Sequence, residues 1–256
     1  MLTQQGCGQR ASLFAAAVMM LATGLAQADT SYQGPPVRIG KGSAHTVVHV
    51  DDSGKAVAVG LVLSAAALQG LPKPTGEHTD FAYQLRMPAK GPKTVVDHVV
   101  VNWESTGHPP PKVYDVPHFD FHFYLVSRHE QMQVSFNSEA ESGDPAQQPP
   151  AELLPAGYVV PPGTAVPQMG VHAINPAAGE FQGQPFTATF IYGYHQQQLT
   201  FLEPMASLAF LQSQPDFSAA VPRPASYSKP GSYPASYSVR YQRASKSYEI
   251  LLSELQ

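Results

Sequence analysis

The segment Pro117–Glu130, with the sequence PHFDFHFYLVSRHE, concentrates residue types that bind metal ions and carry protons. It holds three histidines, one aspartate and four aromatic residues, in a chain of which only 13% is charged. His118, Asp120 and His122 stand at every second position, with a phenylalanine between each pair. Imidazole and carboxylate donors together suit zinc, and they also suit iron or manganese. The segment is therefore a candidate metal site.

The spacing of these residues favours a β-strand over residues 118–127. A strand would place the aromatic residues at odd positions on one face and the polar residues at even positions on the other. A helix would bring His118 and His122 one turn apart, a natural spacing for a metal pair, but it would scatter the phenylalanines. Along a strand, residues four apart are separated by about 13 Å. We therefore expect His118 and His122 to share an ion only where the strand bends or bulges.

Two further segments carry residues that would complete a site. His172 lies in PQMGVHAINP (167–176), which is bounded by prolines as a ligand loop would be. Glu203 lies in the apolar run LTFLEPMA, where a carboxylate is costly to bury unless it is paired or bound to a metal. We expect these distant segments to converge on one ion. The predicted metal ligands are His118, His122, His172 and Glu203, with Asp120 as a further ligand or a flanking residue.

The donor set predicts zinc as the cofactor, with iron, manganese or copper as alternatives. Copper stays open because thioethers favour Cu(I), and Met132, Met169 and Met205 are available. Mixed histidine and carboxylate sites often keep a coordination position open for water. Such a water would serve hydrolysis or hydration of a small substrate, with Asp120 or Glu104 as the candidate catalytic residue.

Three alternatives to an enzyme remain open at this stage. The protein would be a metal-sequestering or stress protein, a binding module with a structural ion, or a fold with a self-satisfied network of histidine and aspartate. The chain lacks the G-x-S-x-G and H-E-x-x-H signatures of known hydrolases. Among the other histidines, we expect only His108 to border the site, together with Trp103, Glu104 and Tyr114. We expect His45, His49, His98 and His195 to be ordinary surface or hydrogen-bonded residues.

The elements that must position these residues are predicted to be mainly strands. Twenty-five prolines and twenty glycines argue against a helical bundle. We predict an all-β fold, a mainly antiparallel sandwich or barrel, with one short helix at 64–72 and a long surface loop at 138–168. The predicted strands are 45–50, 56–64, 94–103, 118–127, 132–137, 186–194, 198–205, 238–242 and 247–255.

The N-terminal segment, residues 1–28, has the layout of a secretory signal peptide. Arg10 precedes an apolar run of fifteen residues, Ala11–Leu25, and the triplet Ala26-Gln27-Ala28 follows as a cleavage site. The run is shorter than the ~20 residues that span a bilayer. We expect a periplasmic or secreted protein that does not stay inserted in a membrane after cleavage. Residues 29–256 would then form a single β-rich metal-binding domain without cysteine, because the only cysteine is Cys7.

The composition also bears on partners. Lysines and arginines are scattered and the net charge is −4, so we expect no nucleic-acid partner. We expect a small molecule or an ion as the ligand, and a homo-oligomer stays open.

Three segments, NWESTGHPPPKVYDVPHFDFHFY, VPQMGVHAINP and FIYGYHQQQLTFLEPM, together resemble a bacterial domain family of unknown function. Many members of that family are exported, and it was first seen structurally in a thermophile protein. The resemblance extends roughly from VAVGLVLSAAALQGLP to the final predicted hairpin. It implies that HFDFH, MGVH and LEPM are hallmark segments, the same three selected above on chemical grounds, and it implies no particular reaction.

Overall fold

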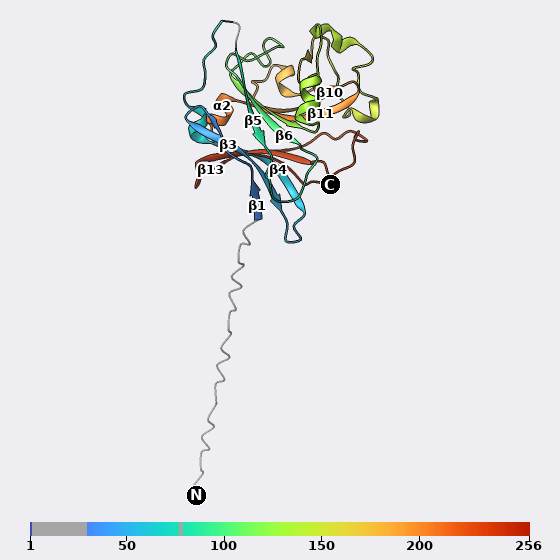
Figure 1. The fold of residues 1–256 in the computed structure, drawn as a ribbon. Coiled ribbons are helices and arrows are strands. Elements are labelled where there is room, and N and C mark those ends of the chain that lie inside the picture. Colours follow the sequence, from blue (N-terminus) through green and yellow to red (C-terminus); the bar gives the residue numbers. More distant parts are fainter. Residues whose placement is uncertain (2–29, 77–78) are drawn as a thin grey trace.

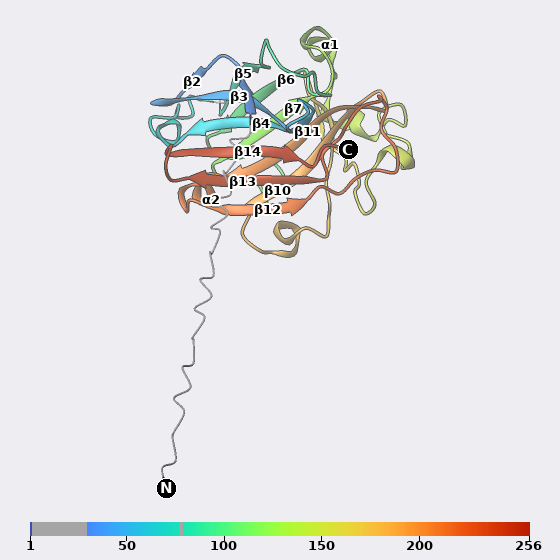
Figure 2. The same ribbon diagram turned by 90° about the horizontal axis from the view of Figure 1, so that it is seen from below.

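Two antiparallel sheets lie face to face (Figure 1). The computed structural model describes Met1, residues 30–76 and residues 79–256, so the expected leader lies outside the described residues except for Met1. The first sheet contains β1 (Thr30–Gln33), β2 (Val37–Ile39), β3 (Gly42–Val50), β4 (Ala56–Ser64), β12 (Asp216–Ala220), β13 (Ser236–Gln242) and β14 (Ser247–Ser253). Its spatial order is β1-β3-β4-β14-β13-β12, with β2 also paired to β3. Figure 2 shows the run from β3 to β12 from below.

The second sheet carries the segments singled out above. It contains β5 (Asp80–Arg86), β6 (His98–Glu104), β7 (His118–Tyr124), β8 (Ala165–Val166), β9 (Gly170–Ala173), β10 (Ala188–His195) and β11 (Gln198–Ser207). Its spatial order is β5-β6-β7-β11-β10-β9-β8. The predicted all-β, mainly antiparallel fold is confirmed. The β7 segment thus lies near the middle of a sheet, with β11 beside it and β9 two strands further on.

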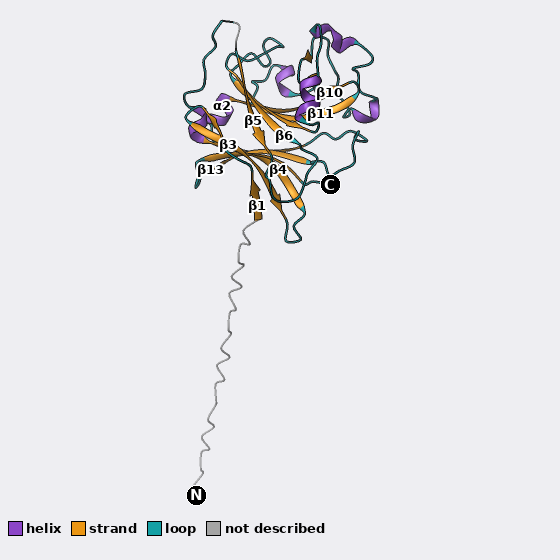
Figure 3. Cartoon of the chain, viewed as in Figure 1, coloured by secondary structure: helices purple, strands orange, loops and turns teal. Residues whose placement is uncertain are grey.

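The helices are short and lie around the sheets (Figure 3). They are α1 (Arg128–Gln133), α2 (Leu208–Gln212) and the 3-10 turns η1 (Ala65–Leu68), η2 (Glu139–Gly143), η3 (Ala151–Leu153) and η4 (Gly179–Gln182). Within the described part of the chain, every helix is too short or too polar to cross a membrane. The predicted long loop at 138–168 is interrupted only by short turns and by β8.

The main core lies between the sheets. Leu61 of β4 pairs with Ile250 of β14, and both side chains are fully buried. Phe119, Phe121 and Phe123 of β7 meet them from the second sheet in one cluster. Because strand side chains alternate, the residues between these phenylalanines must lie on the opposite, outer face of the second sheet.

That outer face is also covered. Ile191 and Met205, on β10 and β11, form a second apolar cluster with Tyr114, Ile174 and Phe186 of the connecting segments. Polar residues on this face are therefore removed from water, even though they lie outside the main core.

Two predicted elements are wrong in detail. Residues 132–137 do not form a strand, because α1 extends into them. Ser127 starts that helix with a capping box, in which its hydroxyl accepts from the Glu130 N–H and the Glu130 carboxylate accepts from the Ser127 N–H.

The helix expected at 64–72 is only the single turn η1. Ser64, the expected N-cap, makes no capping hydrogen bond there. Its hydroxyl instead accepts from the Ser43 N–H on the neighbouring strand β3. The side chain therefore ties the turn to the sheet and does not extend it into a longer helix.

Candidate metal centre

The two faces of β7 have different neighbours, although all seven residues of the strand are buried. The three phenylalanines pack in the main core. On the outer face, Tyr124 packs with Val100 and Phe201 in a separate small cluster. The structure thus confirms the predicted strand and excludes the helical alternative. The polar residues at even positions share the outer face with Tyr124.

Strand β11 brings Glu203 opposite His122. Leu202 pairs with Phe123, so the next residues along the two antiparallel strands face each other. His122 Nε2 lies 3.4 Å from Glu203 Oε1, and the two residues are 1% and 2% exposed. A carboxylate and an imidazole therefore meet in an almost dry environment.

His172 reaches this pair from β9, two strands away. Gly193 of β10 lies between His172 and Phe201 in the register. A side chain at this glycine would collide with the Phe201 ring, whose centroid is 4.8 Å from that of His122 and 5.4 Å from that of His172. His172 Nδ1 lies 2.9 Å from the Thr164 carbonyl oxygen. Nδ1 therefore donates to that carbonyl, and Nε2 keeps its lone pair.

The structure brings His122, His172 and Glu203 together as a group, here called the central trio. One ligand atom from each lies within 4.8 Å of the others. Both ring nitrogens of His122 and Oε2 of Glu203 are buried without a hydrogen-bond partner. Buried polar atoms are nearly always paired in folded proteins. The trio therefore presents free electron pairs to a common point, as metal ligands do.

Burial sets the protonation of the trio. It lowers the pKa of His122 to about 3 and the pKa of His172 to about 4. Both imidazoles are neutral at pH 7, and neutral imidazole is the form that coordinates a metal. Burial, together with the negative charge of Asp120 and that of Glu104 when it is ionised, raises the pKa of Glu203 well above its usual value. A bound cation would offset this effect and keep the carboxylate ionised.

The structure places His118 away from the central trio, although the sequence predicted it as a fourth ligand. Strands β6 and β7 pair along their whole length without a bulge. His118 and His122 therefore stay about 13 Å apart along the strand. One ion cannot bind both.

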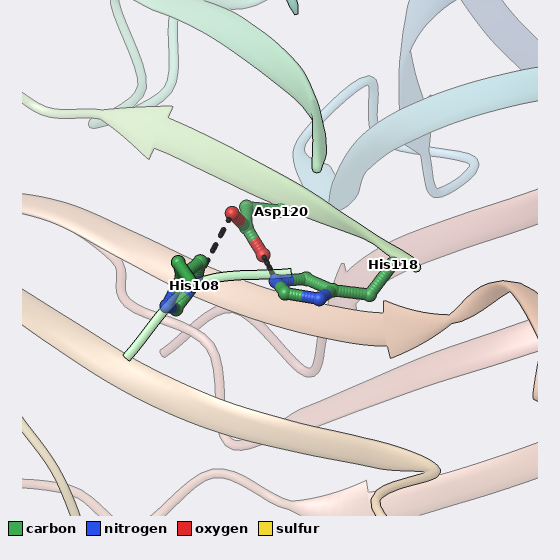
Figure 4. Close-up of side chains that lie close together, drawn as sticks. All are labelled: His108, His118 and Asp120. Carbon is green, nitrogen blue, oxygen red and sulfur yellow. Dashed lines mark ion pairs between the residues drawn. The ribbon is translucent and has the colours of Figure 1, made fainter. Parts of the chain in front are cut away.

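His118 belongs instead to a second group with Asp120 and His108, here called the edge trio (Figure 4). His118 Nε2 lies 3.0 Å from Asp120 Oδ1, and His108 Nε2 lies 3.6 Å from Asp120 Oδ2. Burial alone would raise the pKa of Asp120, but the two imidazoles outweigh burial and hold it below its usual value. Asp120 is thus an ionised carboxylate next to the central trio.

Glu104, the other predicted catalytic residue, is buried at the end of β6. It pairs with His118 in the register. Burial and the charges of Asp120 and Asp80 raise the pKa of Glu104 to about 8, against a smaller opposing effect of His108. Glu104 therefore carries a proton at neutral pH.

The residues expected to border the site divide between the two faces. His108 and Tyr114 lie on the outer face, with their ring centroids 5.6 Å apart. Trp103 turns the opposite way, packs in the main core and donates from Nε1 to the Pro72 carbonyl. The expectation was therefore wrong for Trp103, whose odd position on β6 sends it inward.

Sequence reasoning missed three contributors. His108 was placed only at the border, yet it shares Asp120 with His118. Thr164 orients His172 through a backbone carbonyl, and Gly193 leaves room for Phe201. No pattern in the sequence marks a carbonyl or a missing side chain as part of a site. His98, by contrast, is hydrogen-bonded as expected, to Asp97 and Gln131.

One family model matches part of the chain. Residues 51–103 match the model of an uncharacterised family described as "TTHB210-like: Hypothetical protein TTHB210". This is consistent with the resemblance to an uncharacterised family first seen in a thermophile protein. The match ends before β7 and therefore does not include the HFDFH, MGVH and LEPM segments. No curated protein and no solved structure matches the chain.

Proposed function

We propose that this protein is an exported metal-binding protein that holds a divalent ion, zinc in the first place, at His122, His172 and Glu203. The observation that carries the proposal is the lack of hydrogen bonds at the His122 ring. Both of its ring nitrogens are buried without hydrogen-bond partners, beside a buried carboxylate. A metal ion bound to Nε2 would satisfy one nitrogen and the unpaired oxygen of Glu203 together.

The charge balance of the outer face supports a cation. Glu104, Asp120 and Glu203 are each at most 6% exposed. Among the described residues, no ion pair brings a lysine or an arginine to any of them. The neighbour of Glu203, His122, is neutral, and a buried carboxylate without a cationic partner is costly, a cost that a divalent ion would remove.

The burial of the ligands favours retention of the ion over rapid exchange. Two surface hollows share the segment 92–95, and neither includes a residue of the central trio. The proposed role is therefore sequestration or storage of the ion, or stabilisation of the fold by it.

A second candidate function, hydrolysis or hydration of a small substrate, is favoured by one feature of the site. Three protein ligands leave a fourth zinc position for water, as in catalytic sites, and Glu104 on the same face of the sheet carries a proton at neutral pH. If this reaction occurs, zinc-loaded protein should hydrolyse small esters or phosphoesters. Glu104→Gln should slow it by about 10²–10⁴-fold while the metal content stays unchanged.

Elemental analysis tests the metal proposal directly. Protein purified without a metal-affinity tag should contain an ion at the central trio. Glu203→Gln keeps the side-chain shape but removes the charge, so it should lose that ion, and His172→Ala should do the same. His129→Ala, at an exposed position on α1, is the matched control and should keep the ion. Full metal content in both trio variants, with native circular dichroism, would contradict the proposal.

Export is tested by mass spectrometry of the protein recovered from the periplasm of a Gram-negative host. The expected mature chain begins at Asp29. An intact Met1 or Leu2 terminus in that fraction would contradict the proposed leader.

A further inference from the structure

We propose that the edge trio, His108, His118 and Asp120, is a second divalent-cation site, separate from the central trio. Its three donors are two imidazole nitrogens and a carboxylate, a set that suits zinc, iron or manganese. Donors bound to one zinc at 2.0–2.2 Å lie about 3–4 Å from one another. The distances of 3.0 Å and 3.6 Å from the imidazoles to the Asp120 oxygens fall in this range.

Backbone carbonyls orient both imidazoles toward Asp120. His118 Nδ1 lies 2.7 Å from the Val116 oxygen, and His108 Nδ1 lies 2.7 Å from the Pro109 oxygen. A carbonyl only accepts, so each Nδ1 carries a proton, and Nε2 is the nitrogen that faces the carboxylate and would bind a metal ion once it is unprotonated. This arrangement, in which a carbonyl fixes the tautomer, is typical of metal-binding histidines.

The closest contact of the edge trio is not a hydrogen bond. His118 and Asp120 are 0% and 3% exposed, and His118 Nε2 and Asp120 Oδ1 both lack a hydrogen-bond partner although they are 3.0 Å apart. Such a close approach of a ring nitrogen and a carboxylate oxygen requires a positive charge, either a proton on Nε2 or a metal ion. A metal ion bound to both atoms would replace that proton and form two bonds.

The loop that carries His108 is shaped before any ion binds. Gly107 has a φ of 77°, which suits glycine, and a side chain there would collide with the Tyr114 carbonyl. The His108 N–H donates to that carbonyl at 3.1 Å. The imidazole also lies edge-on to His118, with ring centroids 4.7 Å apart. The His108 ring is thus held near His118 and Asp120 by backbone contacts and ring packing.

The two trios would hold separate ions of different accessibility. Asp120 and His122 are two residues apart on one strand, about 7 Å, whereas ions that act as a bridged pair lie about 3.5–4 Å apart. The His108 side chain is 32% exposed, whereas His122 is 1% exposed. We therefore expect the ion of the edge trio to exchange more readily with the solvent.

Zinc titration of the full metal-stripped protein by calorimetry, with elemental analysis after desalting, tests this inference. The wild-type protein should bind two ions. Loss of an outer partner of a ligand typically costs 10–100-fold in metal affinity, so loss of the direct ligand in His108→Ala should weaken the second site by at least about 100-fold. Asp120→Asn should do the same, and the exposed control His129→Ala should bind two ions.

The outcomes separate this inference from the proposed function. One wild-type ion that is lost in His172→Ala and kept in His108→Ala would overturn the second site and leave the first. One ion that is lost in His108→Ala and kept in His172→Ala would overturn the first and support the second. Two ions with equal affinity in wild type and His108→Ala would also overturn the inference. Circular dichroism verifies that each variant is folded.

Discussion

The residues on the outer face of the second sheet differ from those of an ordinary β-sheet surface. The buried carboxylates of Glu104, Asp120 and Glu203 lie there with the imidazoles of the two trios, and the ion pairs of the described residues include no lysine or arginine for any of them. Protons or metal ions must therefore balance the charge. This balance makes the metal-free protein sensitive to pH.

At the residue scale, we predict that the metal-free protein loses stability between pH 6.5 and 9. The pKa of Glu104 is raised from 4.5 to about 8, and the pKa of His108 is raised from 6.5 to about 9. For His108, burial acts in the opposite direction, but the carboxylate of Asp120 and the Pro109 carbonyl outweigh it. Each group keeps its proton longer in the folded state, so its stabilising contribution is lost as pH rises through the folded pKa.

Urea denaturation of metal-stripped protein at pH 6.5, 8 and 9.5 measures this loss. In Glu104→Gln the decline should be smaller, because the group at this position no longer titrates. His122 and His172, whose pKa values are about 3 and about 4, stay neutral in the folded state throughout this range. They titrate only in the unfolded state near pH 6.5, which adds a small opposing rise in stability at the acidic end. A free energy of unfolding that stays constant or rises with pH would contradict the prediction.

At the scale of elements, two features decide which side chains meet. These are the regular pairing of β7 and the absence of a side chain at Gly193 of β10. Because β7 has no bulge, it distributes its polar residues between two sites. Because β10 has glycine at position 193, the Phe201 ring can pack against the rings of both His122 and His172. The neighbouring strands thus shape the site as much as the ligands do.

We therefore predict that Gly193→Ala disturbs the central trio without touching a ligand. The new methyl group would collide with the Phe201 ring, and overpacking of this kind costs about 1–3 kcal/mol. The displaced ring should also shift both imidazoles and weaken metal binding. Urea denaturation and zinc calorimetry measure the two effects.

Gly143→Ala is the matched control for this substitution. Gly143 lies at the end of η2 and a side chain there would meet nothing within 4 Å. It should leave both measurements near the wild-type values. Wild-type stability and zinc affinity in Gly193→Ala would show that the glycine is not needed for the site.

At the scale of the whole molecule, the two trios join parts of the chain that are far apart. The central trio links β7, β9 and β11, and the edge trio links β7 to the loop before it. The described residues contain no cysteine, so no disulfide can make such links within them. A bound ion would connect these segments instead.

We predict that removal of metal lowers the melting temperature substantially. An ion that binds only the folded state at about 100 times its Kd adds about 2.7 kcal/mol. For a domain of this size that corresponds to roughly 5–10 °C. Differential scanning calorimetry before and after treatment with a chelator measures the shift. The same treatment should produce a smaller shift in Glu203→Gln, and an equal shift would place the stabilising ion elsewhere.

The sequence alone determined the fold class, most of the strands and the faces of β7. Alternation with period two is a local property, so HFDFHFY fixes which side chains point together once the segment is extended. Glu203, the only carboxylate in its apolar run, was likewise expected to have a charged partner or a metal ion, because burial of an unpaired charge is costly. Its convergence with His122 and His172 was expected on these grounds.

Only the tertiary structure decided how the ligands are divided. Whether His118 joins His122 depends on a bulge, and the absence of a bulge follows from the regular pairing of β7 with β6, which local sequence does not reveal. The role of His108 depends on how the loop at Gly107 folds back onto Tyr114. The role of Gly193 depends on the Phe201 ring of the neighbouring strand. These contacts join residues through space, and only the assembled sheet brings them together.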